Sequence, residues 1–161
     1  MSTLLVVHHS PTSTVRSLTD AVVAGANDDA IEGVEVVVRA ALEANADDVL
    51  AADGYLLGTT ANFGYMSGAL KHFFDTIFLQ AGGALGEDGA AAEAGGGRKP
   101  FGLWVHGRYD TTGAARSVLS IVQALPWTRS AEVLEVLGEV TAEHREAAHD
   151  LGGTLAALLM E

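Results

Sequence analysis

Residues 4–15 read Leu-Leu-Val-Val-His-His-Ser-Pro-Thr-Ser-Thr-Val, a change from apolar to polar residues that predicts where a strand ends and a helix starts. The four apolar residues indicate a buried strand. Beyond the polar turn, Val15, Leu18 and Val22 recur with the i, i+3 and i+7 spacing of a helix. A helix N-terminus has unpaired N–H groups and the positive end of the helix dipole, a combination that binds phosphate. This stretch therefore predicts a phosphate site between the first strand and the first helix.

Strand-like and helix-like segments alternate along the rest of the chain. The expected strands cover residues 3–8, 34–39, 54–58, 101–106 and 132–137. The expected helices cover residues 13–26, 46–52, 66–78, 115–122 and 148–158. This alternation predicts an α/β fold, a three-layer sandwich with helices on both faces of a five-stranded parallel sheet. The strands are almost continuously apolar, which is typical of a sheet covered on both faces.

Length and composition point to a single domain, residues 1–161. The absence of cysteine excludes disulfide scaffolds, zinc–cysteine sites and thiol catalysis. A formal net charge of −12 disfavours binding to nucleic acid or to anionic membranes. No apolar run is long enough to span a membrane and no signal peptide is evident, so we expect a cytoplasmic protein. The histidines are not spaced as ligands of a metal ion, so no metal site is expected.

The turn after the first strand carries hydroxyl side chains at Ser10, Thr12, Ser13 and Thr14. A single hydroxyl is enough to cap a helix, so an ordinary cap is the alternative explanation. Because the turn holds no lysine, its hydroxyls would complete an anion site with little added charge. We therefore expect the phosphate of a cofactor at this turn.

Two further loops follow strands, and the carboxyl ends of parallel strands meet at one edge of a sheet. In the loop at 59–65, Phe63 and Tyr65 are large residues among small ones, a composition that suits packing against a planar ligand. In the loop at 107–113, Tyr109 is placed to stack on an aromatic ring. The alternative is that both loops are ordinary surface turns.

Three stretches of the sequence are similar to motifs of a known family. Residues 52–59 read Ala-Asp-Gly-Tyr-Leu-Leu-Gly-Thr, residues 63–75 read Phe-Gly-Tyr-Met-Ser-Gly-Ala-Leu-Lys-His-Phe-Phe-Asp, and residues 99–101 read Lys-Pro-Phe. With the order of elements, these motifs resemble the flavodoxin-like family of FMN-binding proteins. Within it, they are most similar to the branch of NAD(P)H-dependent FMN reductases and quinone reductases. The resemblance covers nearly the whole chain and implies the strand order 2-1-3-4-5.

The resemblance also implies which residues bind FMN. Those expected at the phosphate are Ser10, Thr12, Ser13, Thr14 and Val15. Those expected along the isoalloxazine ring are Thr60, Ala61, Asn62, Phe63 and Gly64. Those expected on the other side of the ring and at the ribityl chain are Gly107, Arg108, Tyr109 and Asp110. The family motif has Pro, Thr and Tyr where this chain has Thr60, Ala61 and Asn62, so the ring-binding turn is reshaped.

The resemblance implies an FMN-dependent oxidoreductase that takes electrons from NADH or NADPH and passes them to a quinone or another small acceptor. The flavin performs this chemistry, so no catalytic acid or base is expected, and His106 is expected to be a hydrogen-bonded residue at a strand end. Two alternatives stay open. One is a one-electron carrier like flavodoxin, whose acidic charge suits a basic partner. The other is a flavodoxin-like binding module that has lost flavin.

Members of the reductase branch often form homodimers in which a neighbour covers the flavin, so a homodimer is expected here. The candidate contacts are Trp127, expected on the surface or in an interface, and the glycine-rich residues 81–97. Glycine raises the entropic cost of ordering, so residues 81–97 are expected to be a flexible connector, with a lid over the cofactor as the alternative. Other α/β functions lack their motifs, because no Walker A loop, dinucleotide-binding glycine motif or nucleophile elbow is present.

Overall fold

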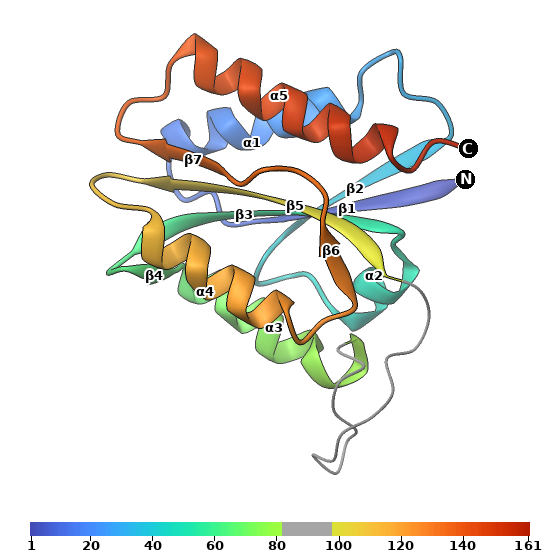
Figure 1. The fold of residues 1–161 in the computed structure, drawn as a ribbon, viewed down its shortest axis with the longest axis horizontal. Coiled ribbons are helices and arrows are strands. Elements are labelled where there is room, and N and C mark those ends of the chain that lie inside the picture. Colours follow the sequence, from blue (N-terminus) through green and yellow to red (C-terminus); the bar gives the residue numbers. More distant parts are fainter. Residues whose placement is uncertain (82–97) are drawn as a thin grey trace.

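Apolar strands form a central sheet with helices on both faces (Figure 1). The computed structural model describes residues 1–81 and 98–161, so the predicted flexible connector lies outside the described residues except for Ala81. The strands are β1 (Ser2–His8), β2 (Val34–Ala40), β3 (Gly54–Asn62), β4 (Tyr65–Met66), β5 (Lys99–Gly107), β6 (Trp127–Arg129) and β7 (Leu134–Leu137). The helices are α1 (Ser13–Ala26), α2 (Ala46–Ala51), α3 (Gly68–Ala81), α4 (Thr112–Val122) and α5 (Ala142–Ala157).

The strand order is β2-β1-β3-β5, followed by β6 and β7, and these strands pair in parallel. This order confirms the predicted order 2-1-3-4-5, with the fifth strand divided into two pieces. β6 pairs with the first residues of β5, and β7 pairs with its last residues. The sequence predicted a strand only at 132–137 and missed β6, because its three residues are too few to show a periodic pattern.

Alternate residues of β1 face opposite layers of the sandwich. Leu4 and Val6 belong to the apolar cluster shared with α1 and α5, whereas Leu5 and Val7 belong to the cluster shared with α3 and α4. Figure 1 shows α1 and α5 on one face of the sheet and α2, α3 and α4 on the other. Each of these buried side chains contributes about 1.5–3 kcal/mol to folding. The two clusters together fix the sheet between its helical layers.

Trp127 belongs to the core, so its expected place on the surface or in an interface is wrong. The side chain is 4% exposed, and its ring stacks on Tyr55 with the ring centroids 4.0 Å apart. Pairing of β6 with β5 turns the indole into this layer, where Phe73 and Phe74 are also buried. Trp104 is buried in the opposite layer among residues of α1 and α5.

Helices α1 and α5 approach each other closely because glycine lies at their contact. A Cβ atom on Gly152 would collide with the carbonyl oxygen of Val22, and one on Gly25 would collide with that of His149. The neighbouring Gly153 is less crowded, since the nearest atom to a Cβ there would be 3.4 Å away. The contact between these helices therefore depends on backbone packing at specific positions.

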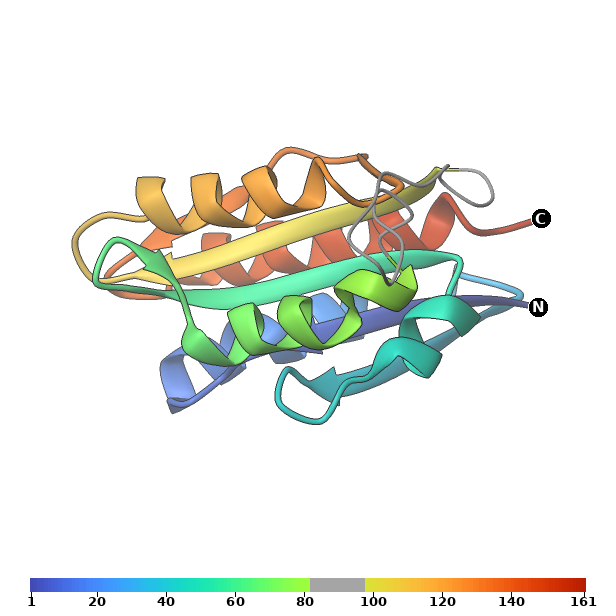
Figure 2. The ribbon, with the colours of Figure 1, turned by 90° about the horizontal axis from the view of Figure 1, so that it is seen from below.

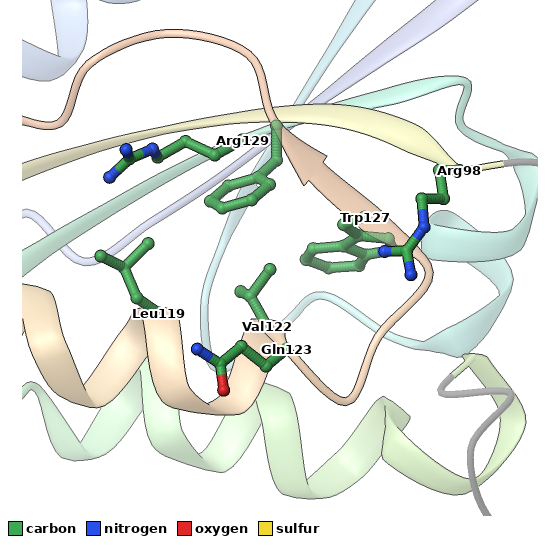
Figure 3. Close-up of a pocket in the computed structure, with 7 residues that line it drawn as sticks. Arg98, Leu119, Val122, Gln123, Trp127 and Arg129 are labelled. Carbon is green, nitrogen blue, oxygen red and sulfur yellow. The ribbon is translucent and has the colours of Figure 1, made fainter.

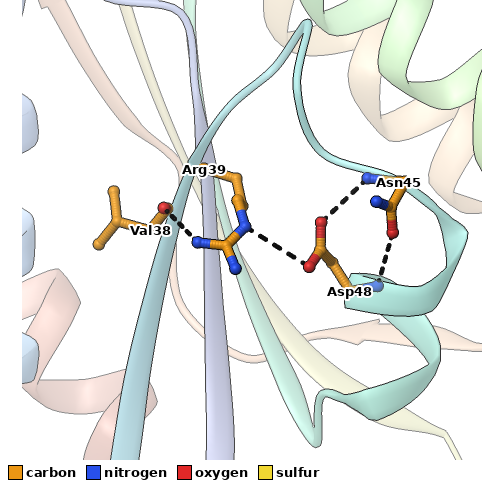
Figure 4. A network of polar contacts seen from close by, with 4 residues as sticks. All are labelled: Val38, Arg39, Asn45 and Asp48. Atoms are coloured by element: carbon orange, nitrogen blue, oxygen red, sulfur yellow. Dashed lines mark hydrogen bonds and ion pairs between the residues drawn. The ribbon is translucent and has the colours of Figure 1, made fainter.

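The short helix α2 is held by its N-terminal cap (Figure 4). The N–H of Asp48 donates to Asn45 Oδ1 (3.0 Å), and the N–H of Asn45 donates to Asp48 Oδ2 (3.1 Å), which makes a reciprocal capping box. Arg39 of β2 adds an ion pair, with 3.5 Å between its Nε and Asp48 Oδ1. The ion pair between Arg39 and Asp48 therefore links the cap of α2 to the strand β2.

Candidate functional site

The three predicted loops lie at one edge of the sheet, at the C-terminal ends of β1, β3 and β5 (Figure 2). Backbone contacts join them there. The N–H of His9 donates to the carbonyl oxygen of Gly58 (3.0 Å), and Thr60 lies beside His106 in the sheet register. These loops, which are far apart in the sequence, therefore form one rim.

The loop between β1 and α1 presents hydroxyls around the start of α1. Thr12 caps the helix, because its Oγ1 accepts the N–H of Val15 at 3.3 Å. The side chains of Ser13 and Thr14 are exposed, whereas that of Val15 is buried and its N–H is already donated to Thr12. The first N–H groups of a helix have no acceptor within the helix, which leaves those of Ser13 and Thr14 to bind an anion.

Ser10 is placed differently from the other hydroxyl residues of this loop. Its Oγ shares hydrogen bonds with His8 Nδ1 (2.8 Å) and with Thr19 Oγ1 (2.7 Å). Burial lowers the pKa of His8, and the charges of Arg16 and His9 lower it further, so the imidazole is neutral at pH 7. The Ser10 side chain therefore fixes the loop on α1, and a ligand would have to compete with these contacts for it.

Arg16 brings a positive charge to the loop that the sequence analysis missed. Its Nη2 donates to the carbonyl oxygen of Ser10 at 3.5 Å, and the side chain is otherwise exposed. The turn itself holds no lysine, and Arg16 lies just beyond it on α1. The signal that could have found this residue is its position four residues after Thr12, one helical turn beyond the cap.

The turn expected after the third strand is the tip of a β-hairpin. β3 continues four residues beyond the predicted end at Gly58, and Asn62 pairs antiparallel with Tyr65 of β4. Phe63 and Gly64 at the tip have φ angles of 52° and 75°, and positive values at both positions are the signature of a type I′ turn. A phenylalanine in this region costs about 1–3 kcal/mol, and its side chain is 108% exposed, so no packing contact offsets that strain.

The hairpin is anchored to α3 and α4. Ser67 donates from its N–H to Thr59 Oγ1 (2.9 Å) and caps α3 by accepting the N–H of Leu70 (3.1 Å). A Cβ atom on Gly113, in the first turn of α4, would collide with the carbonyl oxygen of Gly64. The hydroxyl of Thr60 is buried and has no hydrogen-bond partner among the described residues. The β3–β4 hairpin is thus anchored at its base while Phe63 at its tip is exposed.

The loop between β5 and α4 carries an exposed aromatic residue and two opposite charges. Tyr109 is 83% exposed, and the Arg108 guanidinium lies 5.6 Å from its ring centroid, in cation–π contact. Asp110 accepts the N–H of Thr112 at 2.9 Å, and this hydrogen bond lowers the pKa of the carboxyl group. Asp110 is therefore ionised at neutral pH. Gly107 lies against Ala61, so this loop and the hairpin pack together at their bases.

A cavity of about 390 Å³ lies between the first loop and the end of β5. Its lining residues are Thr12, Thr14, His106, Arg108, Gly138 and Glu139. His106 Nε2 lies 2.6 Å from the carbonyl oxygen of Gly138, which confirms the hydrogen bond expected for this histidine. Gly138 and Glu139 were missed by the sequence analysis, because they reach the site only through the pairing of β7 with β5.

The chemistry of this rim fits a phosphate attached to a flat ring. Hydroxyls, helix N–H groups and Arg108 suit the phosphate. Glu139 lines the same cavity, and its negative charge opposes a phosphate placed close to it. Phe63, Tyr65 and Tyr109 are exposed aromatic residues on the two loops beside it. Among the described residues, no group of three or more His, Cys, Asp or Glu side chains is arranged to hold a metal ion.

Comparison with known sequences gives a partial match. No protein-family model matches the chain. A flavodoxin of Aquifex aeolicus is 35% identical over 77 residues, which cover 48% of this chain and 40% of the relative. The match therefore spans less than half the length of that relative.

Comparison with solved structures covers the whole fold. A flavodoxin from the domain Archaea gives a TM-score of 0.77 at 15% identity, over 97% of each chain. A flavodoxin from Streptococcus pneumoniae gives 0.76 at 18% identity, over 98% of this chain and 100% of that chain. A WrbA-like flavodoxin protein from Agrobacterium tumefaciens gives a TM-score of 0.69 at 17% identity, over 98% of this chain and 97% of that chain. These likenesses confirm the predicted flavodoxin-like fold.

Proposed function

We propose, starting from the flavodoxin-like fold of this chain, that it binds FMN at the described sheet edge and carries electrons between redox partner proteins. Several proteins to which it is similar are named flavodoxins, including the Aquifex aeolicus relative at 35% identity. These relatives support the electron carrier, which the sequence analysis kept as an alternative, better than the NAD(P)H-dependent oxidoreductase.

One observation carries the proposal: Thr12 and Thr14 at the start of α1 and Arg108 of the β5–α4 loop line the same cavity. The N–H groups of Ser13 and Thr14, the hydroxyl of Thr14 and the guanidinium would hold the FMN phosphate. A hydrogen bond to a charged group contributes about 1.5–3 kcal/mol, so a few such contacts supply much of the affinity for a phosphate. Arg16 adds positive potential at the base of the same loop.

The flavin ring would lie along the β3–β4 hairpin and the β5–α4 loop. Phe63 and Tyr109 offer exposed aromatic faces, and Asn62 offers an exposed amide side chain to the edge of a ring. An aromatic pair of this kind contributes about 0.5–1.5 kcal/mol beyond the area that it buries. FMN, when bound, supplies the reversible uptake and release of electrons, and the chain supplies its position and electrostatic environment.

The charge of the chain favours a basic redox partner. Acidic residues outnumber Lys and Arg by 21 to 9. Opposite charges steer two proteins together, and salt screens this attraction over a distance of about 10 Å at 0.1 M ionic strength. We therefore expect electron transfer to a basic partner to slow down as the salt concentration rises.

The NAD(P)H-dependent oxidoreductase is the second candidate. Its support is the WrbA-like flavodoxin protein of Agrobacterium tumefaciens among the similar structures, together with the motif at 63–75. In this case NADH or NADPH would reduce FMN at the same rim, and a quinone or another small acceptor would take the electrons.

Two properties of the whole protein stay predictions. No helix of the described ranges is long and apolar enough to cross a membrane, and a cytoplasmic location remains our expectation. The predicted homodimer is tested by sedimentation of the purified chain with and without FMN. With Trp127 in the core, a dimer would have to use other residues.

A redox experiment separates the candidates. The FMN-loaded chain is titrated potentiometrically and, separately, mixed with NADH or NADPH under argon. The carrier predicts two separate one-electron steps and flavin absorbance that the nucleotides do not bleach. Rapid bleaching by either nucleotide would favour the oxidoreductase, and failure to take up FMN would favour the binding module without flavin.

A further inference from the structure

The strand β2 forms one margin of the sheet (Figure 2). Within residues 1–81 and 98–161 it pairs with β1 and with no other strand. Its seven residues read Val-Glu-Val-Val-Val-Arg-Ala, with neither proline nor glycine to interrupt pairing. An edge strand of this length and composition is a template for another strand unless something covers it.

The opposite margin of the sheet is divided into short pieces. β6 has three residues and β7 has four. Figure 3 shows β6 as a short strand, with Trp127 on the side of the sheet that α4 covers. Short edge strands offer few backbone groups to an incoming strand. The edge at β2 is therefore the one suited to extending the sheet.

The outer edge of β2 presents the backbone groups of its even-numbered residues. The residues on either side of β2 bond to β1: the N–H of Ser2 donates to the carbonyl oxygen of Gly33 (3.0 Å), and the N–H of Ala41 donates to that of His8 (2.8 Å). Successive residues of a strand direct their N–H and C=O groups to opposite sides, so the odd-numbered residues bond to β1. Those that face outward are Val34, Val36, Val38 and Ala40.

The side chains of β2 are self-complementary about Val37. Glu35 lies two residues before it and Arg39 two residues after it, and both are exposed. If two copies of β2 lie antiparallel with Val37 opposite Val37, Glu35 of each copy faces Arg39 of the other. The same alignment places Val36 opposite Val38, and both of these residues direct their backbone groups outward.

This alignment satisfies the geometry of an antiparallel pair. Residues with outward backbone groups form the hydrogen-bonded pairs, and the odd-numbered residues form the non-hydrogen-bonded pairs, in which opposite side chains are closest. The charged residues therefore fall at the positions of closest side-chain approach. Opposite charges placed there stabilise strand pairing, and like charges destabilise it.

We propose that β2 pairs antiparallel with β2 of a second copy of this chain, so that the two sheets join across a twofold axis. A twofold interface requires a surface that complements itself, as the charges and valines of β2 do. This interface goes beyond the proposed function. It uses none of the loops at the proposed FMN site, so it stands whether or not the chain binds flavin.

The charges select one alignment and one occupant. A shift of the pairing by two residues keeps the outward groups opposite each other, but it places Glu35 opposite Val37 or Ala41. Only the alignment centred on Val37 pairs each carboxylate with a guanidinium. A strand of another protein would need the same reversed pattern of charges, which a second copy supplies by symmetry.

Arg39 can serve the interface without losing its contact with α2. Its Nε lies 3.5 Å from Asp48 Oδ1, and its Nη1 donates to the carbonyl oxygen of Val38 at 3.2 Å (Figure 4). A guanidinium has five N–H donors, so it can bridge Asp48 and an incoming Glu35 carboxylate. The carbonyl oxygen of Val38 would then accept the N–H of Val36 from the other copy.

The expected dimer is weak, because each copy contributes a single strand. Small interfaces of this kind are typical of transient complexes, so we expect a dissociation constant of roughly 1–100 μM. Two chains of net charge −12 also repel each other. Salt at about 0.15 M screens this repulsion beyond about 8 Å, so the measurements are made at that ionic strength.

An exchange of charges tests the alignment by sedimentation equilibrium of the full chain. Glu35→Arg places arginine opposite Arg39, and Arg39→Glu places glutamate opposite Glu35. We expect each variant alone to raise the dissociation constant at least about tenfold, since opposite charges are replaced by like charges twice per dimer. The double variant should dimerise again.

A mixture of the two single variants should form a heterodimer, because arginines of one then face glutamates of the other. Both variants keep a strong net negative charge, so overall charge does not bring them together. Glu146→Arg, which changes an exposed residue of α5 by the same charge, is the matched control and should dimerise like the unmodified chain. Equal unfolding midpoints in urea show that the variants are folded.

Hydrogen exchange of the backbone amides tests which groups pair. In the unmodified chain at high concentration, we expect slow exchange at Val36 and Val38, and faster exchange there in Glu35→Arg. The amide of Val37, which faces β1, should stay protected in both.

Three results would overturn the proposal. They are a chain that stays monomeric at about 0.5 mM, a dimer that Glu35→Arg and Arg39→Glu leave intact, and a mixture of these variants that stays monomeric. A monomeric chain would leave the edge of β2 to a strand of a different protein. A chain that binds no FMN but dimerises with this dependence on charge would refute the proposed function and support this interface.

Discussion

The backbone N–H of Met66 donates a hydrogen bond to Ser117 Oγ, 3.1 Å away, and this contact joins the β3–β4 hairpin to α4. Ser117 in turn donates to the carbonyl oxygen of Ala114 at 2.8 Å. Because Met66 is 2% exposed, no solvent can replace the serine as acceptor. The contact therefore fixes the turn along which the flavin ring is proposed to lie.

Replacing this serine should loosen the hairpin. Leaving a buried N–H without an acceptor costs about 1–3 kcal/mol, so we expect Ser117→Ala to lower the free energy of unfolding by that amount in urea. FMN affinity should fall as well. Ser130→Ala, which removes an exposed hydroxyl outside the site, is the control, and an equal loss in both variants would contradict this role.

We expect the strained backbone of Phe63 to lower the stability of the chain while its ring contributes to FMN binding. Its φ of 52° suits Asn or Gly at the first position of a type I′ turn, so we expect Phe63→Asn to raise the free energy of unfolding by about 1 kcal/mol. FMN affinity should fall because the aromatic face is lost. Phe63→Ala keeps the strain and removes the ring, so it should lose affinity without gaining stability. Equal stability of the two variants would refute the strain.

The proposed phosphate contacts can be separated from the ring contacts with riboflavin, which lacks the phosphate. We expect Arg108→Gln to weaken FMN binding about tenfold, since a guanidinium–phosphate contact contributes at least about 1.4 kcal/mol. Arg16→Gln should have a smaller effect in the same direction. Riboflavin binding should not change in either variant, and isothermal titration calorimetry measures both ligands. A parallel loss of riboflavin affinity would argue against phosphate recognition by these arginines.

The apolar pattern of the sequence was sufficient for the alternation of strands and helices, whereas the strand order came from the family resemblance. Val15, Leu18 and Val22 repeat with helical spacing, and the residues at these positions are buried as the pattern requires. Patterns of this kind involve residues that are close together in the sequence, so they can be recognised without knowledge of the tertiary structure. Trp127 shows the limit, because β6 is short and its place in the core depends on pairing with β5.

The details of the candidate site depend on contacts between distant residues. Phe63-Gly64 does not indicate a type I′ turn, since phenylalanine is unusual at positive φ, and the hairpin was therefore not predicted. Glu139 enters the rim through the pairing of β7 with β5, and Arg16 through the fold of the loop over α1. The FMN-binding roles of the residues named from the sequence stay predictions.

The packing of α1 on α5 predicts opposite effects for two neighbouring glycines. Gly152→Ala places a methyl group against the carbonyl oxygen of Val22, so we expect a loss of about 1–3 kcal/mol in the free energy of unfolding. Gly153→Ala meets its nearest atom at 3.4 Å and gains helix propensity, so it should be neutral or stabilising by up to about 1 kcal/mol. Thermal unfolding of both variants checks this, and a similar change in both would contradict the close contact.

The partly buried His8 predicts a dependence of stability on pH. Burial lowers its pKa in the folded chain below the ordinary value of 6.5, so the unfolded chain binds more protons as the pH falls below 6.5. The free energy of unfolding should therefore decrease as the pH falls through 6.5 toward the lower folded pKa. His8→Gln should remove this part of the decrease in urea unfolding measured on both sides of that pH. An unchanged pH dependence in the variant would show that His8 does not contribute.

The most direct test of the proposed FMN site is a titration of the purified chain with FMN, followed by the quenching of flavin fluorescence. We predict saturable binding of one FMN per chain, abolished by Thr14→Glu, which puts a carboxylate where the phosphate would lie. Thr128→Glu, at the far end of the sheet, should bind FMN normally. No binding by the unmodified chain, or equal binding by Thr14→Glu, would contradict the account.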